Sequence, residues 1–200
     1  MSIAAIILAG GLARRMGGGQ KALLHLGGRH LVGHAIERIA PQAAQVALNV
    51  NVDDPAFGSL DLPLVKDTVP DFAGPLAGIL AGLEWAAAQS PVPEWLLSAP
   101  TDAPFLPGDL VERLLAAAVR EDAEVSVAES GDRTHPVVAL WRTDLRDALH
   151  DALVVRDIRK IDRFTAERRT VLVEWSTDGG DPFFNVNKPH DLEAAEALLA

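Results

Sequence analysis

Cysteine is absent from the 200-residue sequence. Without thiols the chain has no disulfide, no thiolate zinc site and no sulfur nucleophile, and this composition fits a reducing compartment. Long apolar stretches are absent as well, since none approaches the roughly 20 residues that span a bilayer. The opening MSIAAIILAGG carries no basic leader before its short apolar run. We therefore expect a cytoplasmic protein with no membrane contact.

Positive charge is scarce, because 18 Lys and Arg against 28 Asp and Glu give a net charge of −10. A nucleic-acid-coating surface needs a basic face, so we expect no nucleic-acid partner. The amino-terminal part differs from the rest. No carboxylate precedes Glu37, whereas four cations do: Arg14, Arg15, Lys21 and Arg29. This asymmetry predicts an anionic ligand near the amino terminus.

What is present is enough apolar material for one core, with 48% hydrophobic residues in 21.3 kDa. A domain of this size removes roughly 70% of its unfolded-chain surface from water, so it needs neither disulfides nor a structural metal to fold. No internal repeat or low-complexity linker divides the sequence. We expect a single domain over residues 1–200, monomeric by default.

Alternating apolar runs and helical periodicities predict an open, mainly parallel α/β sheet, with three α/β/α layers in a Rossmann-like arrangement. Strands are expected at residues 3–8, 45–50, 62–66, 95–99, 124–128, 136–141 and 171–175. Helices are expected at 31–40, 74–89, 107–120, 143–167 and 191–199. The expected helix at 143–167 is densely charged in both signs, which is typical of a solvated helix, although its arginines could also bind an anionic substrate or a partner protein.

Polar residues follow the predicted strands. Asn49 and Asn51 end the second strand, Asp67 ends the third and Asp102 ends the fourth, while a glycine-rich loop follows the first. Open parallel sheets bind ligands beyond the carboxyl ends of their strands. We therefore expect these residues to share one site.

The loop LAGGLARRMGGGQK, residues 8–21, holds five glycines and three cations directly after a buried strand. Glycine lets backbone N–H groups approach a ligand, and concave N–H arrays favour phosphate oxygens. Arg15 and Lys21 would add charge for a polyphosphate. The loop is neither G-x-G-x-x-G nor a Walker A sequence. It predicts another kind of nucleotide site, the plain alternative being a solvated surface loop.

Six segments together resemble one family in order: LAGGxxxRMGxxxK, NVN at 49–51, DTVPDFAGPLAG from Asp67, PTDAPFLP around Asp102, RTHP ending at Pro136, and FNVNKPHDL from Phe184. The chain is similar, over essentially its whole length, to the molybdenum cofactor guanylyltransferases. The resemblance implies the nucleotidyltransferase fold and a Mg²⁺-dependent transfer of GMP from GTP to molybdenum-molybdopterin. Transient contacts with cofactor-synthesis proteins or molybdoenzyme chaperones are implied as well.

Residue roles follow from the same resemblance. Catalytic roles fall to Arg15, Lys21 and Asp102, with Asp102 also holding the metal. The implied GTP site comprises Leu8, Ala9, Gly10, Gly11, Lys21, Asn49, Asp67 and Asp102, and the implied pterin segment contains Asn185 and Asn187. One position departs from the pattern, because similar loops often carry an aspartate where this chain has Gln20.

Several of these residues have simpler interpretations. Asp102 could be no more than a cap of a helix or turn, and Asp67 could be a turn aspartate before Val69-Pro70. Asn185 and Asn187 could form Asx turns before the last helix. His30 and His34 are four residues apart but have no third ligand nearby, so a metal site there is not expected. His135, before Pro136, is most simply structural, although the resemblance places it near the site.

The resulting mechanism is electrostatic and positional. A phosphate monoester is largely ionised at neutral pH, so the acceptor needs positioning more than a base, in keeping with a chain that lacks a nucleophile elbow. One alternative is the related cytidylyltransferases, which have a sequence like LAAG where this chain has LAGG. A second is a sugar-phosphate nucleotidyltransferase. From another class, a non-catalytic nucleotide or cofactor delivery factor also stays open.

Overall fold

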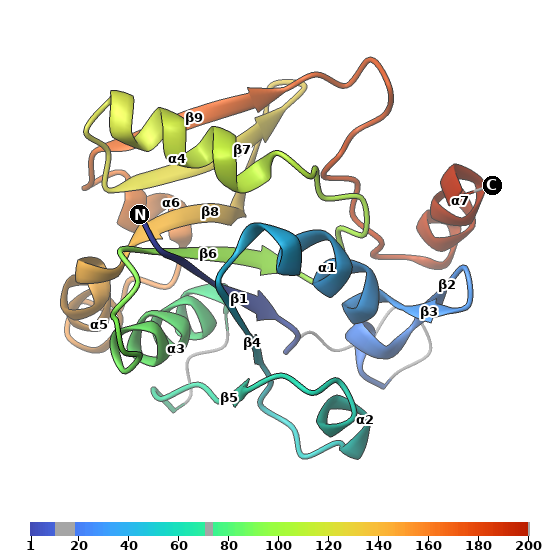
Figure 1. The fold of residues 1–200 in the computed structure, drawn as a ribbon, viewed down its shortest axis with the longest axis horizontal. Helices are drawn as coiled ribbons and strands as arrows, with labels where there is room; N and C mark the ends of the chain where they lie inside the picture. Colours follow the sequence, from blue (N-terminus) through green and yellow to red (C-terminus); the bar gives the residue numbers. More distant parts are fainter. Residues whose placement is uncertain (11–18, 71–73, 200) are drawn as a thin grey trace.

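A computed structural model describes residues 1–10, 19–70 and 74–199 of the chain. Its centre is a seven-stranded sheet in the order β5-β4-β1-β6-β8-β7-β9 (Figure 1). The strands are β1 (Ile3–Leu8), β4 (Gln45–Asn49), β5 (Leu64–Val65), β6 (Trp95–Pro100), β7 (Val125–Ser130), β8 (Arg133–Arg142) and β9 (Thr170–Trp175). Only β8 runs antiparallel to its neighbours β6 and β7, whereas all other pairings in this sheet are parallel.

The central strands are apolar on both faces because both faces are covered. In β1, Ile3, Ala5 and Ile7 belong to one hydrophobic cluster, and Ala4 and Ile6 belong to the other. Successive side chains of a strand point to opposite faces, so a nearly continuous apolar run is required wherever helices pack on both sides. The sequence IAAIIL of β1 therefore builds two cores at once.

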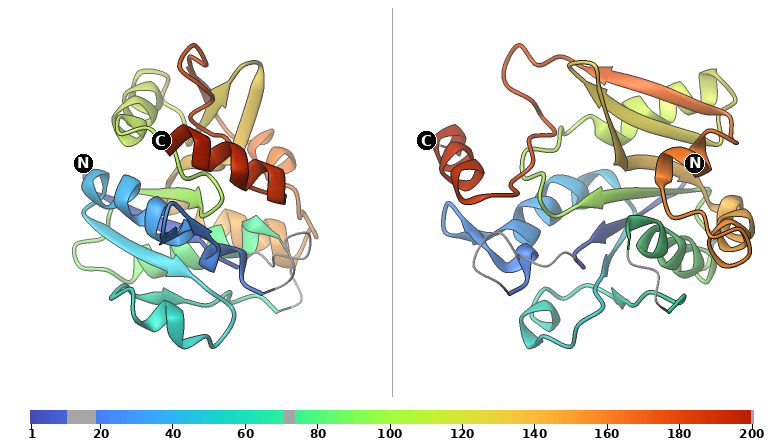
Figure 2. Two further views of the ribbon diagram at one scale, coloured as in Figure 1. Left: turned by 90° about the vertical axis from the view of Figure 1, so that its right-hand side faces the viewer. Right: turned by 180° about the vertical axis from the view of Figure 1, so that it is seen from behind.

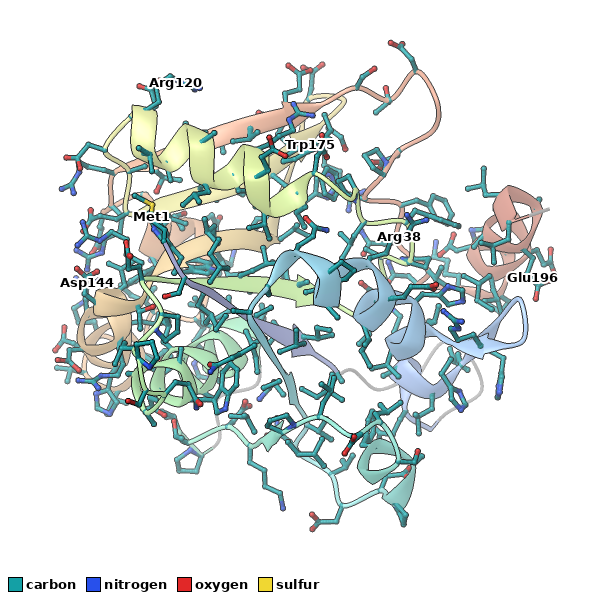
Figure 3. All side chains as sticks on the ribbon, viewed as in Figure 1. Met1, Arg38, Arg120, Asp144, Trp175 and Glu196 are labelled. Atoms are coloured by element: carbon teal, nitrogen blue, oxygen red, sulfur yellow. The ribbon has the colours of Figure 1, made fainter. Side chains whose placement is uncertain are left out.

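Helices form the two outer layers (Figure 2). On one face lie α1 (Leu31–Ile39) and α4 (Leu110–Arg120), and on the other α3 (Pro75–Ala87), α5 (Arg146–Val154) and α6 (Ile161–Thr165). Their outer sides carry charge, as shown by Arg38 on α1 and Arg120 on α4, which are both exposed (Figure 3). The expected three-layer α/β/α fold is confirmed.

Smaller elements lie at the periphery. They are the hairpin of β2 (His25–Leu26) and β3 (Arg29–His30), the helices α2 (Pro55–Gly58) and α7 (Pro189–Leu199), and the 3₁₀ turns η1 (Lys21–Leu23), η2 (Ala40–Gln42) and η3 (Thr143–Leu145). Helix α7 lies beside the β2–β3 hairpin (Figure 1). Leu26 and Leu31 pack there against Val186 and Ala195 in a small separate cluster.

The expected continuous helix over residues 143–167 was wrong. The structure has η3 and α5, then a break, then the short helix α6. Asp157 in the break has φ of 51°, in the left-handed region that a helix interior excludes. The backbone amide of Ile158 instead donates to the carbonyl of Ala152 at 2.8 Å, which turns the chain. No helix in the described part of the chain is long and apolar enough to span a membrane.

Candidate active site

The predicted site residues gather at the carboxyl edge of the sheet. Leu8 is in register with Asn49 on one side and with Pro100 on the other, so β1, β4 and β6 end together. Ala9 continues this alignment, since its buried backbone amide donates to the carbonyl of Asn49 at 2.9 Å. Gly10 follows and is exposed. Gly11 and Arg15 lie outside the described residues.

Three of the predicted residues are joined by one ammonium group. The Nζ of Lys21 lies 2.5 Å from Oδ2 of Asp102 and 2.6 Å from Oδ1 of Asn187. Lys21 comes from η1, Asp102 follows β6, and Asn187 precedes α7. The lysine side chain is 12% exposed and the aspartate side chain 23% exposed, so this pair is partly shielded from water. A cation held at the strand ends beside an open carboxylate is a suitable receptor for a metal-bound polyphosphate.

Asn49, Asn51 and Asp67 form a second network on the same edge. Asn49 Nδ2 donates to Asp67 Oδ1 at 2.8 Å, and Asn51 Nδ2 donates to Asp67 Oδ2 at 2.8 Å. The amide of Asp67 donates in return to Asn51 Oδ1 at 2.8 Å. Both carboxylate oxygens of Asp67 are thus held, one by Asn49 at the end of β4 and the other by Asn51 just after it. Asn49 is only 4% exposed, so in this arrangement its side chain orients Asp67.

Gly78 makes room for this network. A Cβ atom on Gly78 would lie 2.5 Å from Asn49 Oδ1 and 2.9 Å from Leu8 Cδ2. The GPLAG sequence therefore carries a packing requirement, because α3 passes over the ends of β1 and β4 without space for a methyl group. Gly78 contributes to the site without contacting a ligand, and neither composition nor periodicity singles it out.

A cavity of about 230 Å³ opens beside Asp102. Its polar lining includes Arg133, His135 and Asn185, and the ring of Phe183 forms part of its apolar wall. Asn185 Nδ2 donates back to the carbonyl of Phe183 at 3.0 Å, which holds the asparagine against its own segment. His135 is buried, and this burial lowers its pKa from 6.5, with Arg133 adding to the lowering and Asp181 opposing it.

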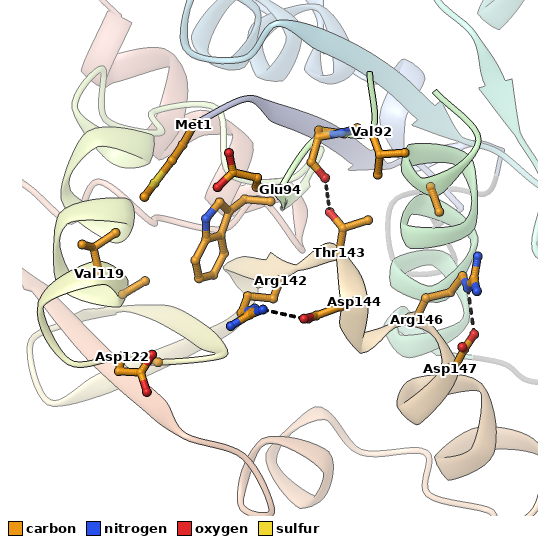
Figure 4. A pocket seen from close by; sticks show the side chains of 15 residues that line it. Met1, Val92, Glu94, Val119, Asp122, Arg142, Thr143, Asp144, Arg146 and Asp147 are labelled. Carbon is orange, nitrogen blue, oxygen red and sulfur yellow. Dashed lines mark hydrogen bonds and ion pairs between the residues drawn. The ribbon is translucent and has the colours of Figure 1, made fainter. Parts of the chain in front are cut away.

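A larger hollow of about 760 Å³ lies at the opposite edge, around the amino ends of β1 and β6 (Figure 4). Both of its arginines are paired with a carboxylate close by in the sequence: Arg142 lies 2.6 Å from Asp144, and Arg146 lies 2.8 Å from Asp147. Thr143 Oγ1 is also committed, donating to the carbonyl of Pro93 at 2.7 Å. None of the predicted site residues lines this hollow, so the smaller cavity is the one joined to the site.

Both members of the histidine pair contact backbone carbonyl groups. A ring nitrogen of His30, Nδ1, is 2.6 Å from the carbonyl of Leu23, and His34 Nε2 is 2.9 Å from the carbonyl of Leu26. Within residues 1–10, 19–70 and 74–199, no three His, Asp or Glu side chains are grouped to hold a metal on their own. A single carboxylate such as Asp102 still suits Mg²⁺, which takes one or two carboxylates together with phosphate oxygens and water.

Two polar residues near the cavity were not predicted. Ser130, at the end of β7, and Asp181, in the loop after β9, are hydrogen-bonded at 2.8 Å. Asp181 does carry a local signal, since Asp-Pro-Phe is a turn sequence and Asp181 Oδ1 accepts from the amide of Phe183 at 2.9 Å. Its pairing with Ser130 depends on how β7 and β9 align, which no short-range pattern contains.

Comparison with solved structures shows the fold, and a family model shows the class. The chain superimposes on molybdopterin-guanine dinucleotide biosynthesis protein A from Archaeoglobus fulgidus with a TM-score of 0.77 at 24% identity, covering 98% of both chains. It superimposes on 2-C-methyl-D-erythritol 4-phosphate cytidylyltransferase from Thermus thermophilus with a TM-score of 0.69 at 22% identity, covering 99% and 98%. Residues 5–171 match the model of the MobA-like NTP transferase domain. Fold and domain together define a nucleotidyltransferase.

Sequence relatives narrow the class further. The chain is 53% identical over 194 residues to a molybdenum cofactor guanylyltransferase of Rhodopseudomonas palustris strain HaA2, covering 97% of this chain and 91% of that protein. It is 50% identical over 199 residues to one of Bradyrhizobium strain ORS 278, covering 100% and 94%. The chain belongs to the molybdenum cofactor guanylyltransferase family.

Proposed function

We propose that this protein transfers GMP from GTP to the terminal phosphate of molybdenum-molybdopterin, forming molybdopterin guanine dinucleotide and pyrophosphate. The observation that carries the proposal is the convergence of Lys21, Asp102 and Asn187 at the carboxyl ends of β1 and β6. The names of the full-length relatives support the choice of substrates.

In this reaction an oxygen of the acceptor phosphate bonds to the α-phosphorus of GTP, and the bond from that phosphorus to the oxygen bridging to the β-phosphate breaks. Pyrophosphate leaves with the electron pair. Because the acceptor phosphate is already largely ionised, the protein supplies alignment and charge neutralisation and needs no general base. Lys21 balances charge on the phosphates, and Arg15 is proposed to act with it.

Asp102 is proposed to hold Mg²⁺. Its carboxylate is partly open to solvent and, within the part of the chain that the structure describes, is paired with one cation, Lys21, which suits a metal that arrives with the nucleotide phosphates. When bound, the metal supplies Lewis-acid stabilisation of the phosphate charge. The Lys21 ammonium would then rotate from Asp102 towards the phosphates, which its flexible side chain allows.

The nucleotide and the acceptor are proposed to approach Asp102 from different sides. Strand β1 ends at Leu8, and Ala9 and Gly10 follow it beside the network of Asn49 and Asp67. This side, together with Gly11 as the next residue of the sequence, is proposed to bind GTP. The cavity containing Arg133 and Asn185 lies on the other side and is proposed to receive the phosphate end of the acceptor. Asn187 links the two sides through Lys21.

The proposal extends to the setting of the reaction. We infer a cytoplasmic, monomeric enzyme that receives its acceptor from cofactor-synthesis proteins and delivers its product through transient contacts with molybdoenzyme chaperones. The net charge of −10 supports the absence of a nucleic-acid partner.

Calorimetric titration of the purified protein with GTP, CTP, ATP and UTP, each with and without Mg²⁺, tests the nucleotide side. We expect selective binding of GTP that strengthens with Mg²⁺ and weakens in Asp67→Asn, because the network of Asn49 and Asn51 is built on that carboxylate. Preference for CTP would move the assignment to the cytidylyltransferases. Binding of GTP without any release of pyrophosphate when molybdopterin is added would indicate a delivery factor.

A further inference from the structure

A row of three hydrogen-bonded polar side chains, His135, Ser130 and Asp181, lies beside the cluster of Lys21, Asp102 and Asn187. No hydrogen bond joins the side chains of the two groups. His135 Nε2 is 2.8 Å from Ser130 Oγ, and Ser130 Oγ is 2.8 Å from Asp181 Oδ1. Ser130 is 3% exposed and His135 5% exposed. The three residues come from the end of β7, from β8 and from the loop after β9, so the row ties that loop to the sheet.

Counting protons fixes the direction of both hydrogen bonds. A hydroxyl has one proton to donate, and an ionised carboxylate can only accept. Ser130 therefore donates to Asp181 and accepts from His135, whose ring must carry its proton on Nε2. Burial favours the neutral ring, so Nδ1 is the nitrogen without a proton.

The same row continues into the segment that carries the two asparagines. Asp181 Oδ1 also accepts from the amide of Phe183 at 2.9 Å. The buried ring of Phe183 lies 4.6 Å from the ring of His135, centre to centre, and 5.3 Å from that of Trp175. Further on, the amide of Val186 donates to the carbonyl of Asp102 at 2.8 Å.

Segment 181–187 is thus fixed at both ends, and Asn185 lies between the two attachments. One attachment is the row of polar side chains at Asp181, and the other is Asp102 itself. Apolar packing alone could bury the loop, but the directional hydrogen bonds of Asp181 with Ser130 and with the amide of Phe183 select one arrangement among several. The placement of Asn185 in the cavity and of Asn187 on Lys21 depends on that arrangement.

We propose that Ser130, His135 and Asp181 are positioning residues for the acceptor substrate: they hold segment 181–187 so that Asn185 and Asn187 face Asp102 and the acceptor cavity. This inference rests on the proposed function, because it names the acceptor as the substrate that the segment serves. The nucleotide side, built from β1, β4 and β5, makes no contact with Ser130, His135 or Asp181 among the described residues.

Replacing Ser130 by alanine tests the proposal, and β7 offers a matched control. Ser126 is also fully buried, but its hydroxyl has no hydrogen-bond partner among the described residues. We expect Ser130→Ala to raise the KM for molybdopterin about tenfold and to leave the KM for GTP within about twofold, as for a lost hydrogen bond to a charged group. Ser126→Ala should change neither KM, and Ser130→Thr, which keeps the hydroxyl, should restore most of the loss.

Equal KM values for molybdopterin in Ser130→Ala and the unaltered protein would overturn the proposal. So would an equal rise in both KM values, because that would indicate general loss of structure. A second measurement does not depend on activity: the ¹⁵N shifts of the His135 ring should report a proton on Nε2, and a proton on Nδ1 would contradict the network. If the unaltered protein releases no pyrophosphate from GTP and molybdopterin while the ring shows the Nε2 proton, the proposed function fails, the acceptor role falls with it, and the network stands only as structure.

Discussion

A single ammonium group organises the site at the scale of residues. Lys21 Nζ contacts a carboxylate oxygen from the end of β6 and an amide oxygen from the segment before α7. Only four lysines occur in the chain, and Lys66 is a useful contrast because its ion pair with Asp53 is exposed at 61% and 89%. Lys21 differs from Lys66 in its burial and in its two side-chain partners, and for this reason the proposed role is assigned to Lys21.

Lys21→Ala should lower kcat by about 100-fold or more, since a preorganised charge at a phosphate-transfer site is lost. Lys66→Ala should leave kcat unchanged, because its ion pair with Asp53 lies in water at high dielectric. Steady-state pyrophosphate release at saturating GTP and Mg²⁺ compares the two variants. Wild-type turnover in Lys21→Ala would remove the assigned role.

The burial of His135 makes stability depend on pH. Its folded pKa lies below 6.5 through burial and the nearby charge of Arg133, against the opposing effect of Asp181. Below about pH 6.5 the unfolded chain binds a proton that the folded chain refuses, so the free energy of unfolding should fall as pH decreases, until the folded pKa is passed.

Urea unfolding at about pH 7.5 and about pH 5.5 measures this dependence. The difference between the two pH values should be smaller in His135→Gln than in the unaltered protein. An undiminished pH difference in His135→Gln would show that other groups cause it.

At the scale of elements, the close approach of α3 to β1 and β4 is the most demanding contact. Gly78→Ala should destabilise the protein by about 1–3 kcal/mol, the usual cost of overpacking. It should also weaken GTP binding, because the methyl group would displace Asn49 and with it Asp67. Gly58→Ala is the matched control, since its Cβ would have nothing within 4 Å. Thermal unfolding and calorimetry would show the contrast, and equal behaviour of both variants would refute it.

The elements that the sequence predicts are those with a periodic apolar pattern, namely the central strands, α1, α3, α4 and α7. The hairpin of β2 and β3 was missed, although its turn residues Gly27 and Gly28, with φ of 57° and 82°, follow a known two-glycine hairpin signal. The break between α5 and α6 was missed because a left-handed aspartate, Asp157, leaves no mark in helical periodicity.

The candidate site likewise contains residues that the sequence predicts and contacts that it does not. Lys21, Asn49, Asp67 and Asp102 lie beside strand ends, so topology and the family resemblance together predict that they gather. The Ser130–Asp181 contact joins positions 51 apart in the chain, and it exists only because the chain returns from β9 to the end of β7. Tertiary alignment of that kind is absent from local sequence patterns.

At the scale of the whole molecule, one sheet joins two cores. Trp141 belongs to the cluster under α3, α5 and α6, and Trp175 to the cluster under α1 and α4. Trp141 Nε1 also donates to Ser98 Oγ at 2.9 Å inside the sheet, which links β8 to β6. The same strands contribute side chains to both clusters, so unfolding of either layer of helices would expose one face of those strands to water.

We therefore predict that the chain unfolds as one cooperative unit and sediments as a monomer. Urea unfolding followed by tryptophan fluorescence and by far-ultraviolet circular dichroism should give coincident transitions. Two separated transitions would contradict a single domain, and a concentration-dependent midpoint would contradict the monomer.

The central claim is the transfer of GMP, and labelled GTP tests it most directly. The unaltered protein is incubated with molybdenum-molybdopterin, Mg²⁺ and GTP labelled either at the α- or at the γ-phosphate. We predict that the α-label enters the pterin product and the γ-label leaves as pyrophosphate, that Asp102→Asn loses both, and that the exposed control Asp144→Asn keeps both. Absence of the α-label from the pterin product, with GTP bound and the protein folded, would contradict the account.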